Sequence, residues 1–279
     1  MSEHLSLDQK YHTLLGTIAQ AGRSGGAAIA FSGGVDSSLL CYAAHEALGD
    51  KAIAVTIVSP MLPQSELLCA SRVAAQIGIT HILVQEDEID AEVAENPVNR
   101  CYFCKKLEFG AVVRTAEEHG IHTVFDGSNL DDQGDYRPGL TALSELGIVS
   151  PLREARLQKN DIRELARRYQ LAVWDKPAYA CLASRIPYGE KIDTGKLARI
   201  ERSEDALRAL GFRQFRVRSH GDLARIEVSP EERPRFFDEA LLDRISQTLK
   251  SFGFVYVAFE LEGYCMGSLN RLISAGSGA

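Results

Sequence analysis

The sequence predicts an α/β protein in which a Rossmann-like parallel sheet is followed by a smaller C-terminal α/β domain. In the first part of the chain, short apolar runs alternate with longer segments whose apolar residues recur at helical spacing. This alternation is typical of a parallel sheet with helices on both faces, because a parallel crossover needs a long connection. A chain of 279 residues is long enough for two domains. We expect them at residues 1–180 and 181–279.

The first domain is predicted to alternate regularly between helices and strands. Helices are expected at 7–18, 36–43, 65–77, 105–119 and 161–169 (the last capped by Asn160), and strands at 27–31, 53–58, 79–84, 123–125 and 148–149. An acidic stretch at 86–99 is predicted to end in a proline-containing loop. Ligands of open parallel sheets bind at the carboxyl ends of the strands. Residues 32–37, directly after the first strand, are therefore expected at the ligand site.

The second domain is predicted to place two arginines on one face of a strand. Its elements are a helix at 197–210, strands at 212–219, 223–228 and 254–261, and a helix at 239–252. Arg216 and Arg218 alternate with apolar residues and therefore project to the same side of the first strand. This face is either solvated or, together with Ser184 and Arg185, a phosphate site, because guanidinium groups match phosphate oxygens.

The composition argues against several classes of protein. Hydrophobic residues make up 45% of the chain and charged residues 25%, as in soluble globular proteins. No apolar run approaches the roughly 20 residues that a membrane span needs. The net charge of −7 makes nucleic-acid binding unlikely, while the nearly neutral, arginine-rich part after residue 184 favours an anionic small molecule. Six cysteines without a secretion signal favour reduced thiols and a cytoplasmic location.

A glycine- and serine-rich turn follows the first strand, with the sequence S-G-G-V-D-S-S at 32–38. Gly33 and Gly34 allow the backbone to approach a ligand closely. Hydroxyl donors come from Ser32, Ser37 and Ser38, and the start of the next helix adds unpaired N–H groups and a partial positive charge. The turn thus predicts a phosphate site. An aspartate, Asp36, fits such a site if it holds a cation such as Mg²⁺ that binds the phosphates.

A polar, glycine-rich stretch at 126–139 follows the strand at 123–125. It begins with Asp126 and Gly127 and contains four aspartates. The stretch is either a solvated loop or a metal or substrate site opposite the turn at 32–38, which we call the phosphate turn.

Cysteine placement points to further chemistry. Cys101 and Cys104 form a C-x-x-C motif, which is compatible with half a zinc site, a redox pair or two iron–sulfur ligands. The chain lacks a second C-x-x-C, which argues against a four-cysteine zinc site. A third thiolate is available from Cys181 if the chain folds back.

The S-G-G-V-D-S turn resembles the loop of the PP-loop ATP pyrophosphatases, which split ATP between its α and β phosphates and transfer AMP to a carboxylate or carbonyl oxygen. The motifs S-G-G-V-D-S, D-G-S-N-L-D-D, C-L-A-S-R-I-P-Y-G and V-R-x-H-x-D-x-A-R-I-E together resemble the LarE family of ATP-dependent sulfur transferases. That family makes the thiocarboxylates of the nickel-pincer nucleotide cofactor.

The resemblance implies that a carboxylate of a pyridinium mononucleotide is adenylated and then attacked by sulfur. It assigns the ATP phosphates and Mg²⁺ to Ser32, Gly33, Gly34, Asp36 and Ser37. The substrate phosphate would lie on Ser184, Arg185, Arg216 and Arg218, with Glu204 nearby. It also implies a homo-oligomer, a hexamer in the family, and a sulfide or a sulfur donor protein as partner.

The family exists in two versions, which differ in the source of the sulfur. In one, a single cysteine sacrifices its own sulfur; that position is Ala180 here. In the other, three cysteines hold a 4Fe–4S cluster that passes on a bound sulfide, and Cys101, Cys104 and Cys181 match these three. We therefore expect cluster-mediated transfer.

Two alternatives remain open within the PP-loop enzymes. An amidating ligase of the NAD or GMP synthetase type would use ammonia in place of sulfur. A tRNA thiolase would need a nucleic-acid-binding domain, which the sequence does not indicate. A third alternative outside enzymes, an adenine-nucleotide sensor, needs no substrate site.

Overall fold

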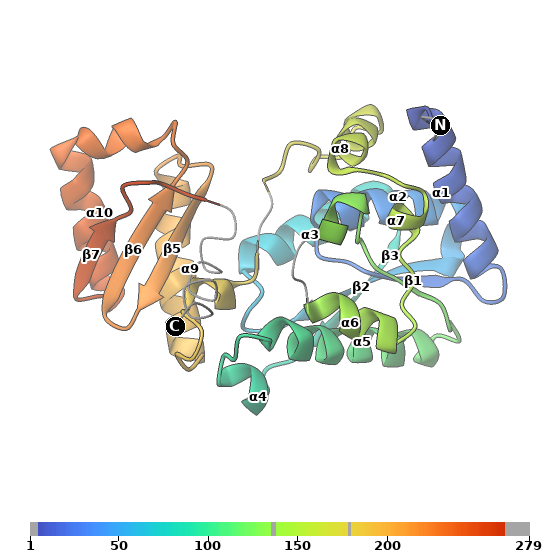
Figure 1. The fold of residues 1–279 in the computed structure, drawn as a ribbon, viewed down its shortest axis with the longest axis horizontal. Coiled ribbons are helices and arrows are strands. Elements are labelled where there is room, and N and C mark those ends of the chain that lie inside the picture. The colour runs from blue at the N-terminus through green and yellow to red at the C-terminus, as the bar shows by residue number, and fades with distance from the viewer. Residues whose placement is uncertain (1–4, 135–137, 178–179, 266–279) are drawn as a thin grey trace. The chain divides into compact units, whose positions relative to one another are not determined.

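A computed structural model describes residues 5–134, 138–177 and 180–265. The chain divides into two compact units (Figure 1). The first unit comprises Met1–Asp87 and Cys101–Tyr179, and the second comprises Glu88–Arg100 and Ala180–Ala279. The second unit thus includes residues 88–100, which the sequence analysis assigned to the first domain.

The first unit is built on a four-stranded parallel sheet. Its strands are β1 (Ala27–Ala30), β2 (Ala52–Val58), β3 (Thr80–Gln85) and β4 (Val124–Phe125), in the order β3-β2-β1-β4. Ala28 of β1 lies opposite Ile53 of β2 and Val124 of β4. The predicted parallel sheet is confirmed, and its central strand β1 ends at the phosphate turn.

Helices cover both faces of this sheet (Figure 1). They are α1 (Leu7–Gly22), α2 (Val35–Leu48), α3 (Gln64–Ile77), α5 (Arg100–Glu118), α6 (Pro138–Glu145), α7 (Pro151–Glu154) and α8 (Lys159–Arg168). One apolar core joins α1, α2, α3 and α8 to the sheet, and another joins α5 and α6 to its opposite face. Residues of β1 alternate between the two cores: Ile29 lies in the first and Ala28 in the second. Burial on both faces explains why the strands read as continuous apolar runs.

The second unit contains a three-stranded mixed sheet. Its elements are α4 (Ala91–Ala94), α9 (Thr194–Ala209), β5 (Phe215–His220), β6 (Leu223–Val228), α10 (Glu239–Ser251) and β7 (Tyr256–Phe259). Strands β5 and β6 form an antiparallel hairpin, and β7 pairs in parallel with β6. A separate apolar core lies between this sheet and its helices. The fold class predicted from the sequence is confirmed for both parts.

Three local expectations differ from the structure. Helix α5 begins at Arg100, five residues before the predicted start at 105, so that the C-x-x-C motif lies in its first turn. Helix α8 is capped by Gln158, not Asn160, because Gln158 and Asp161 exchange the reciprocal hydrogen bonds of a capping box. Val149 forms only an isolated bridge with Phe125. Among the helices in the described ranges, none is long and apolar enough to cross a membrane.

Candidate active site

The phosphate turn connects β1 to α2 and is held close to α3. Gly33 has φ +69°, and a Cβ at this position would lie 2.9 Å from the backbone of Ala70. Only glycine fits without moving one of these segments. Gly34 is the N-cap of α2, and among the residues that the structure describes no side chain caps this 14-residue helix. The first N–H groups of α2 are therefore available to an anionic ligand.

Hydroxyl groups line the turn from both sides. The Oγ atoms of Ser32 and Ser37 lie 3.2 Å apart, and the Gly34 N–H donates to Ser32 Oγ at 3.4 Å. Ser32 is exposed, whereas Ser38 is fully buried. Ser38 Oγ has no hydrogen-bond partner in the part of the chain that the structure describes. Its assignment to the nucleotide site stays a prediction.

Asp36 is the charged residue of the turn, and it already has a cationic partner. Its carboxylate accepts from Lys159 Nζ at 2.5 Å and from Asn129 Nδ2 at 3.2 Å. The backbone N–H of Lys159 donates to Asp131 at 2.7 Å. A divalent cation on Asp36 would therefore compete with the ammonium group of Lys159, a residue that the sequence reasoning did not select.

The loop after β4 meets the phosphate turn, because β1 and β4 are parallel neighbours. A Cβ on Gly127 would lie 3.2 Å from the backbone nitrogen of Ser37. Asp126 is buried and accepts from Ser150 Oγ at 2.5 Å and from Ser128 through both its N–H and its hydroxyl group. The structure thus brings Gly127 to the turn, while hydroxyl and N–H donors occupy the Asp126 carboxylate.

Lys176 is a second cation that the sequence reasoning missed. Its Nζ lies 3.1 Å from the Gly33 carbonyl oxygen, 2.8 Å from Glu66 and 3.2 Å from Cys69 Sγ. The carbonyl side of the Gly33 peptide is thereby held away from the phosphate side of the turn. Cys69 is half-buried at this contact and packs against the first apolar core. No local pattern marks Lys176, because its partners lie more than 100 residues earlier in the chain.

The three cysteines of the predicted cluster site are divided between the units. Cys101 is exposed and Cys104 half-buried in the first turn of α5, whereas Cys181 is exposed in the second unit, before the short helix η3 (Leu182–Arg185). None of these three thiols takes part in a disulfide bond within the described ranges. Over the same residues, no three His, Cys, Asp or Glu side chains are grouped as metal ligands. A joint ligand set of these cysteines stays a prediction.

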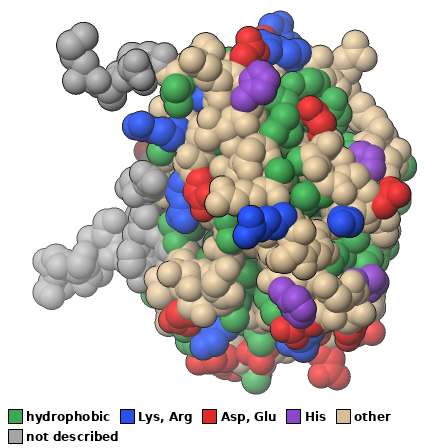
Figure 2. Space-filling model, turned by 90° about the vertical axis from the view of Figure 1, so that its right-hand side faces the viewer, with side chains coloured by type: hydrophobic (Ala, Val, Ile, Leu, Met, Phe, Trp, Pro, Cys, Tyr) green, Lys and Arg blue, Asp and Glu red, His purple; other side chains and the backbone are tan. Residues whose placement is uncertain are grey.

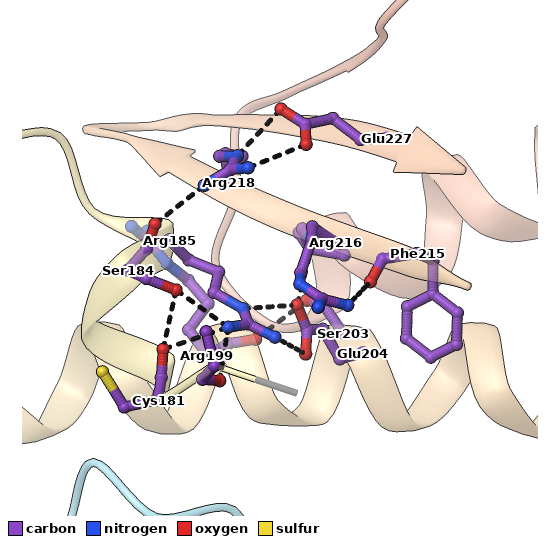
Figure 3. A network of polar contacts seen from close by, with 12 residues as sticks. Cys181, Ser184, Arg185, Arg199, Ser203, Glu204, Phe215, Arg216, Arg218 and Glu227 are labelled. Carbon is purple, nitrogen blue, oxygen red and sulfur yellow. Dashed lines mark hydrogen bonds and ion pairs between the residues drawn. The ribbon is translucent and has the colours of Figure 1, made fainter. Parts of the chain in front are cut away.

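Arg185 and Glu204 form a buried ion pair in the second unit (Figure 3). Their side chains are 0% and 1% exposed, and two hydrogen bonds of 2.9 and 3.0 Å join them. Glu204 also accepts from the backbone N–H of Val217, between the two arginines of β5. Arg185 Nη1 donates to the carbonyl oxygen of Cys181 at 3.0 Å. The turn of Cys181 and strand β5 are therefore held in one network.

The two arginines of β5 are buried, not solvated. Arg218 makes two hydrogen bonds to Glu227, of 2.8 and 2.9 Å, and donates to the Ser184 carbonyl oxygen at 2.8 Å. Arg216 donates to a backbone oxygen, and its guanidinium lies 4.8 Å from the centre of the Tyr264 ring. Both cations are thus buried together with compensating partners, as buried charges require; their role in binding substrate stays a prediction.

Known proteins resemble this chain over part or most of its length. The family model described as asparagine synthase matches residues 23–101, which include the phosphate turn. The uncharacterized protein slr1717 of Synechocystis is 47% identical over 249 residues, covering 89% of this chain and 93% of that protein. The pyridinium-3,5-bisthiocarboxylic acid mononucleotide synthase of Lactiplantibacillus plantarum is 37% identical over 88% of this chain and 89% of its own. The chain belongs to the LarE family of PP-loop ATP pyrophosphatases.

The length of chain that a match covers distinguishes the LarE-type relatives from another PP-loop enzyme. A chain of the glutamine-hydrolyzing GMP synthase of Archaeoglobus fulgidus is 29% identical over 156 residues, 52% of this chain and 51% of its own. The LarE-type match covers nearly the whole chain, whereas this match covers about half. We conclude that the chain is a PP-loop enzyme that uses ATP and that it resembles LarE over both of its units.

Surface charge gives no sign of a polynucleotide site on the face shown in Figure 2. Lysine and arginine side chains are interspersed there with acidic, histidine and apolar ones. A nucleic-acid backbone is usually met by a continuous basic surface.

Proposed function

We propose that this enzyme is an ATP-dependent sulfur transferase that converts a carboxylate of a pyridinium mononucleotide into a thiocarboxylate. The observation that carries the proposal is the whole-chain similarity to the L. plantarum synthase, whose name specifies that chemistry. The open N-terminus of α2 and the buried arginines of the second unit support it, since the reaction needs one site for ATP and one for an anionic nucleotide.

The first step would take place at the phosphate turn. A substrate carboxylate oxygen attacks the α-phosphorus of ATP, the bond between the α and β phosphates breaks, and pyrophosphate leaves. Backbone N–H groups of α2, with Ser32 and Ser37, would stabilise the leaving pyrophosphate. Asp36 would hold Mg²⁺ on the phosphates, displacing the ammonium group of Lys159.

The second step replaces AMP by sulfur. A sulfur nucleophile attacks the acyl carbon, a C–S bond forms, and the bond to AMP breaks. Accessible thiols at Cys101 and Cys181, with Cys104 one helical turn after Cys101, fit thiolate ligation. When bound to these three cysteines, a 4Fe–4S cluster would supply the sulfide that enters the product. The sulfide itself would come from solution or from a donor protein.

The substrate phosphate would be bound in the second unit. The hydroxyl group of Ser184 and the guanidinium groups of Arg216 and Arg218 would bind it. Arg218 donates to Glu227 and to the Ser184 carbonyl oxygen in the network of Figure 3, so a phosphate would replace some of these contacts. The Arg185–Glu204 pair would keep this phosphate site at a fixed spacing from Cys181. A homo-oligomer, the hexamer that the family resemblance suggests, belongs to the same proposal, and light scattering of the purified protein tests it.

An anaerobic assay tests the proposed function. Purified protein is incubated with ATP, Mg²⁺, sulfide and a pyridinium mononucleotide that carries carboxylates, and the products are identified by mass spectrometry. We expect thiocarboxylate, AMP and pyrophosphate in equal amounts, and iron with acid-labile sulfide in the protein. Cys181→Ala should abolish sulfur transfer, whereas the matched control Cys265→Ala, also an exposed cysteine, should not. Unchanged transfer by Cys181→Ala would overturn the assignment of the sulfur site.

An amidating ligase is the second candidate, favoured by the partial similarity to the A. fulgidus GMP synthase. The same assay distinguishes the two reactions when ammonia replaces sulfide. An amide product from iron-free protein would establish the ligase.

A further inference from the structure

The segment Glu88–Arg100 follows β3 in the sequence and ends at the first residue of α5, yet it packs within the second unit. Two backbone hydrogen bonds attach it there: Gly189 N–H donates to the Asn96 carbonyl oxygen at 2.9 Å, and Ile192 N–H donates to Ala94 at 2.7 Å. The segment therefore lies against residues 189–192, which follow Cys181 by eight to eleven positions.

Asn96 is the centre of this contact. The residue is 0% exposed and adopts φ +52°, a left-handed conformation that asparagine tolerates better than most residues. Its Nδ2 lies within hydrogen-bond distance of three carbonyl oxygens: Ile186 at 3.3 Å, Pro187 at 2.7 Å and Glu190 at 3.1 Å. One buried amide group thus holds the turn at 186–190 in a fixed shape.

Arg100 extends the contact toward the cysteine-bearing turn. It is 2% exposed, and its Nη1 donates to Asn96 Oδ1 at 2.6 Å and to the Ala183 carbonyl oxygen at 3.1 Å. The ring centre of Tyr188 lies 5.7 Å from its guanidinium carbon. Separating these groups would remove hydrogen bonds from a buried guanidinium group and a buried amide group, which is strongly unfavourable.

The position of Arg100 in the chain gives this contact its significance. Arg100 is bonded directly to Cys101, and consecutive Cα atoms are about 3.8 Å apart. Its acceptor, Ala183, is two residues after Cys181. One residue of this contact, Arg100, directly precedes the C-x-x-C motif. The other, Ala183, lies two residues after the third cysteine.

We propose that Asn96 and Arg100 are positioning residues that hold the start of the C-x-x-C motif on the turn of Cys181. The inference rests on the proposed function, since it assigns them a role in assembling the three thiols that the sulfur step needs. Buried neighbours that orient ligands in this way commonly determine the affinity of a metal site.

Thiol cross-linking of the metal-free, reduced protein tests the proposal. A short bifunctional thiol reagent, dibromobimane, is added anaerobically, and linked peptides are identified by mass spectrometry. We expect a Cys101–Cys181 product in the wild type and at least a fivefold lower yield in Arg100→Gln and in Asn96→Gly. Glycine keeps the positive φ at position 96 and removes only the side chain. Arg100→Lys should give an intermediate yield.

Hydrogen exchange supplies a second readout that does not depend on thiols. The amides of Gly189 and Ile192 should exchange at least tenfold faster in Asn96→Gly, because their acceptors lie in the released segment. The matched control is Arg114→Gln, an exposed arginine of the same helix α5, which should leave both readouts unchanged.

The outcomes separate this proposal from the proposed function. Wild-type cross-linking and wild-type exchange in the folded Arg100→Gln and Asn96→Gly variants would overturn the positioning role, even if the enzyme transfers sulfur. Cross-linking that depends on both residues, in a protein that binds no iron and transfers no sulfur, would support the positioning role and overturn the proposed function. If Arg100→Gln does not fold, the cross-linking yields and exchange rates of Asn96→Gly and Arg100→Lys test the positioning role.

Discussion

At position 33 the backbone adopts φ +69° beside the backbone of Ala70. A side chain there meets both conformational strain and a steric clash, neither of which relaxes without moving α3 or the turn. Lys176 and the Gly33 carbonyl oxygen fix the same peptide from the other side. The shape of the phosphate turn is therefore determined by one residue without a side chain and one distant cation.

Gly33→Ala should weaken ATP binding at least tenfold and lower the free energy of unfolding by about 1–3 kcal/mol, the usual cost of strain at a left-handed position. Isothermal titration with Mg²⁺–ATP and urea unfolding measure the two effects. The matched control for stability is Gly34→Ala, because Gly34 has an extended backbone and a Cβ there would lie 3.5 Å from Ser32 Oγ. Equal stability loss in both variants would contradict the explanation.

Predictions from single residues depended on the usual role of a residue type. Gly33 and Gly34 were expected to let the backbone approach a ligand, which stays a prediction; the close approach in the structure is that of Gly33 to Ala70 of α3. Lys159 and Lys176 could not be selected, because a lysine on the sequence carries no information about which carboxylate or carbonyl group it will reach.

At the scale of elements, η3, α9 and β5 are tied together by the Arg185–Glu204 pair. The pair has almost no exposure, and Glu204 reaches the backbone of β5 as well. Both charges lost their hydration on folding, so each depends on the other for compensation. Removing one partner therefore costs more free energy of unfolding than the intact pair contributes.

Glu204→Gln should lower the free energy of unfolding by about 3–5 kcal/mol, because it leaves the Arg185 cation buried without its carboxylate. Urea unfolding followed by circular dichroism measures the loss. The control is Glu164→Gln on α8, whose ion pair with Arg167 has side chains 44% and 60% exposed. This exposed pair should contribute at most about 1 kcal/mol, and a similar loss in both variants would contradict burial as the cause.

The order of the elements was predictable, but some of their ends were not. Apolar periodicity located the strands of the first unit within one or two residues. The start of α5 was missed, because Arg100 and the two cysteines do not continue the apolar stripe of the helix. The contact of Arg100 with Ala183, 83 residues later, has no signature in the sequence. The cap of α8 was missed because it depends on a reciprocal bond between Gln158 and Asp161.

At the scale of the whole molecule, the candidate ATP residues lie in one unit and the candidate substrate arginines in the other. Each unit has its own apolar core. Substitutions in one unit should therefore act mainly on the affinity for the ligand that this unit is proposed to bind.

Asp36→Asn should weaken Mg²⁺–ATP binding at least tenfold and leave the affinity for the pyridinium mononucleotide within twofold. Arg216→Lys should show the reverse pattern, since lysine lacks the two-pronged fork of arginine. Titration calorimetry of each variant with each ligand makes the comparison. Loss of both affinities in a folded variant would contradict the division of roles between the units.

The sequence alone determined the alternation of strands and helices, the phosphate turn and the spacing of the C-x-x-C motif. These features are local, since they depend on the spacing of residues within one element and on the conformational freedom of glycine. Only the tertiary structure decided that the arginines of β5 are buried and paired, and that residues 88–100 pack with the second unit. Those outcomes depend on partners far apart in the chain, and burial removes the water that would otherwise satisfy each charge.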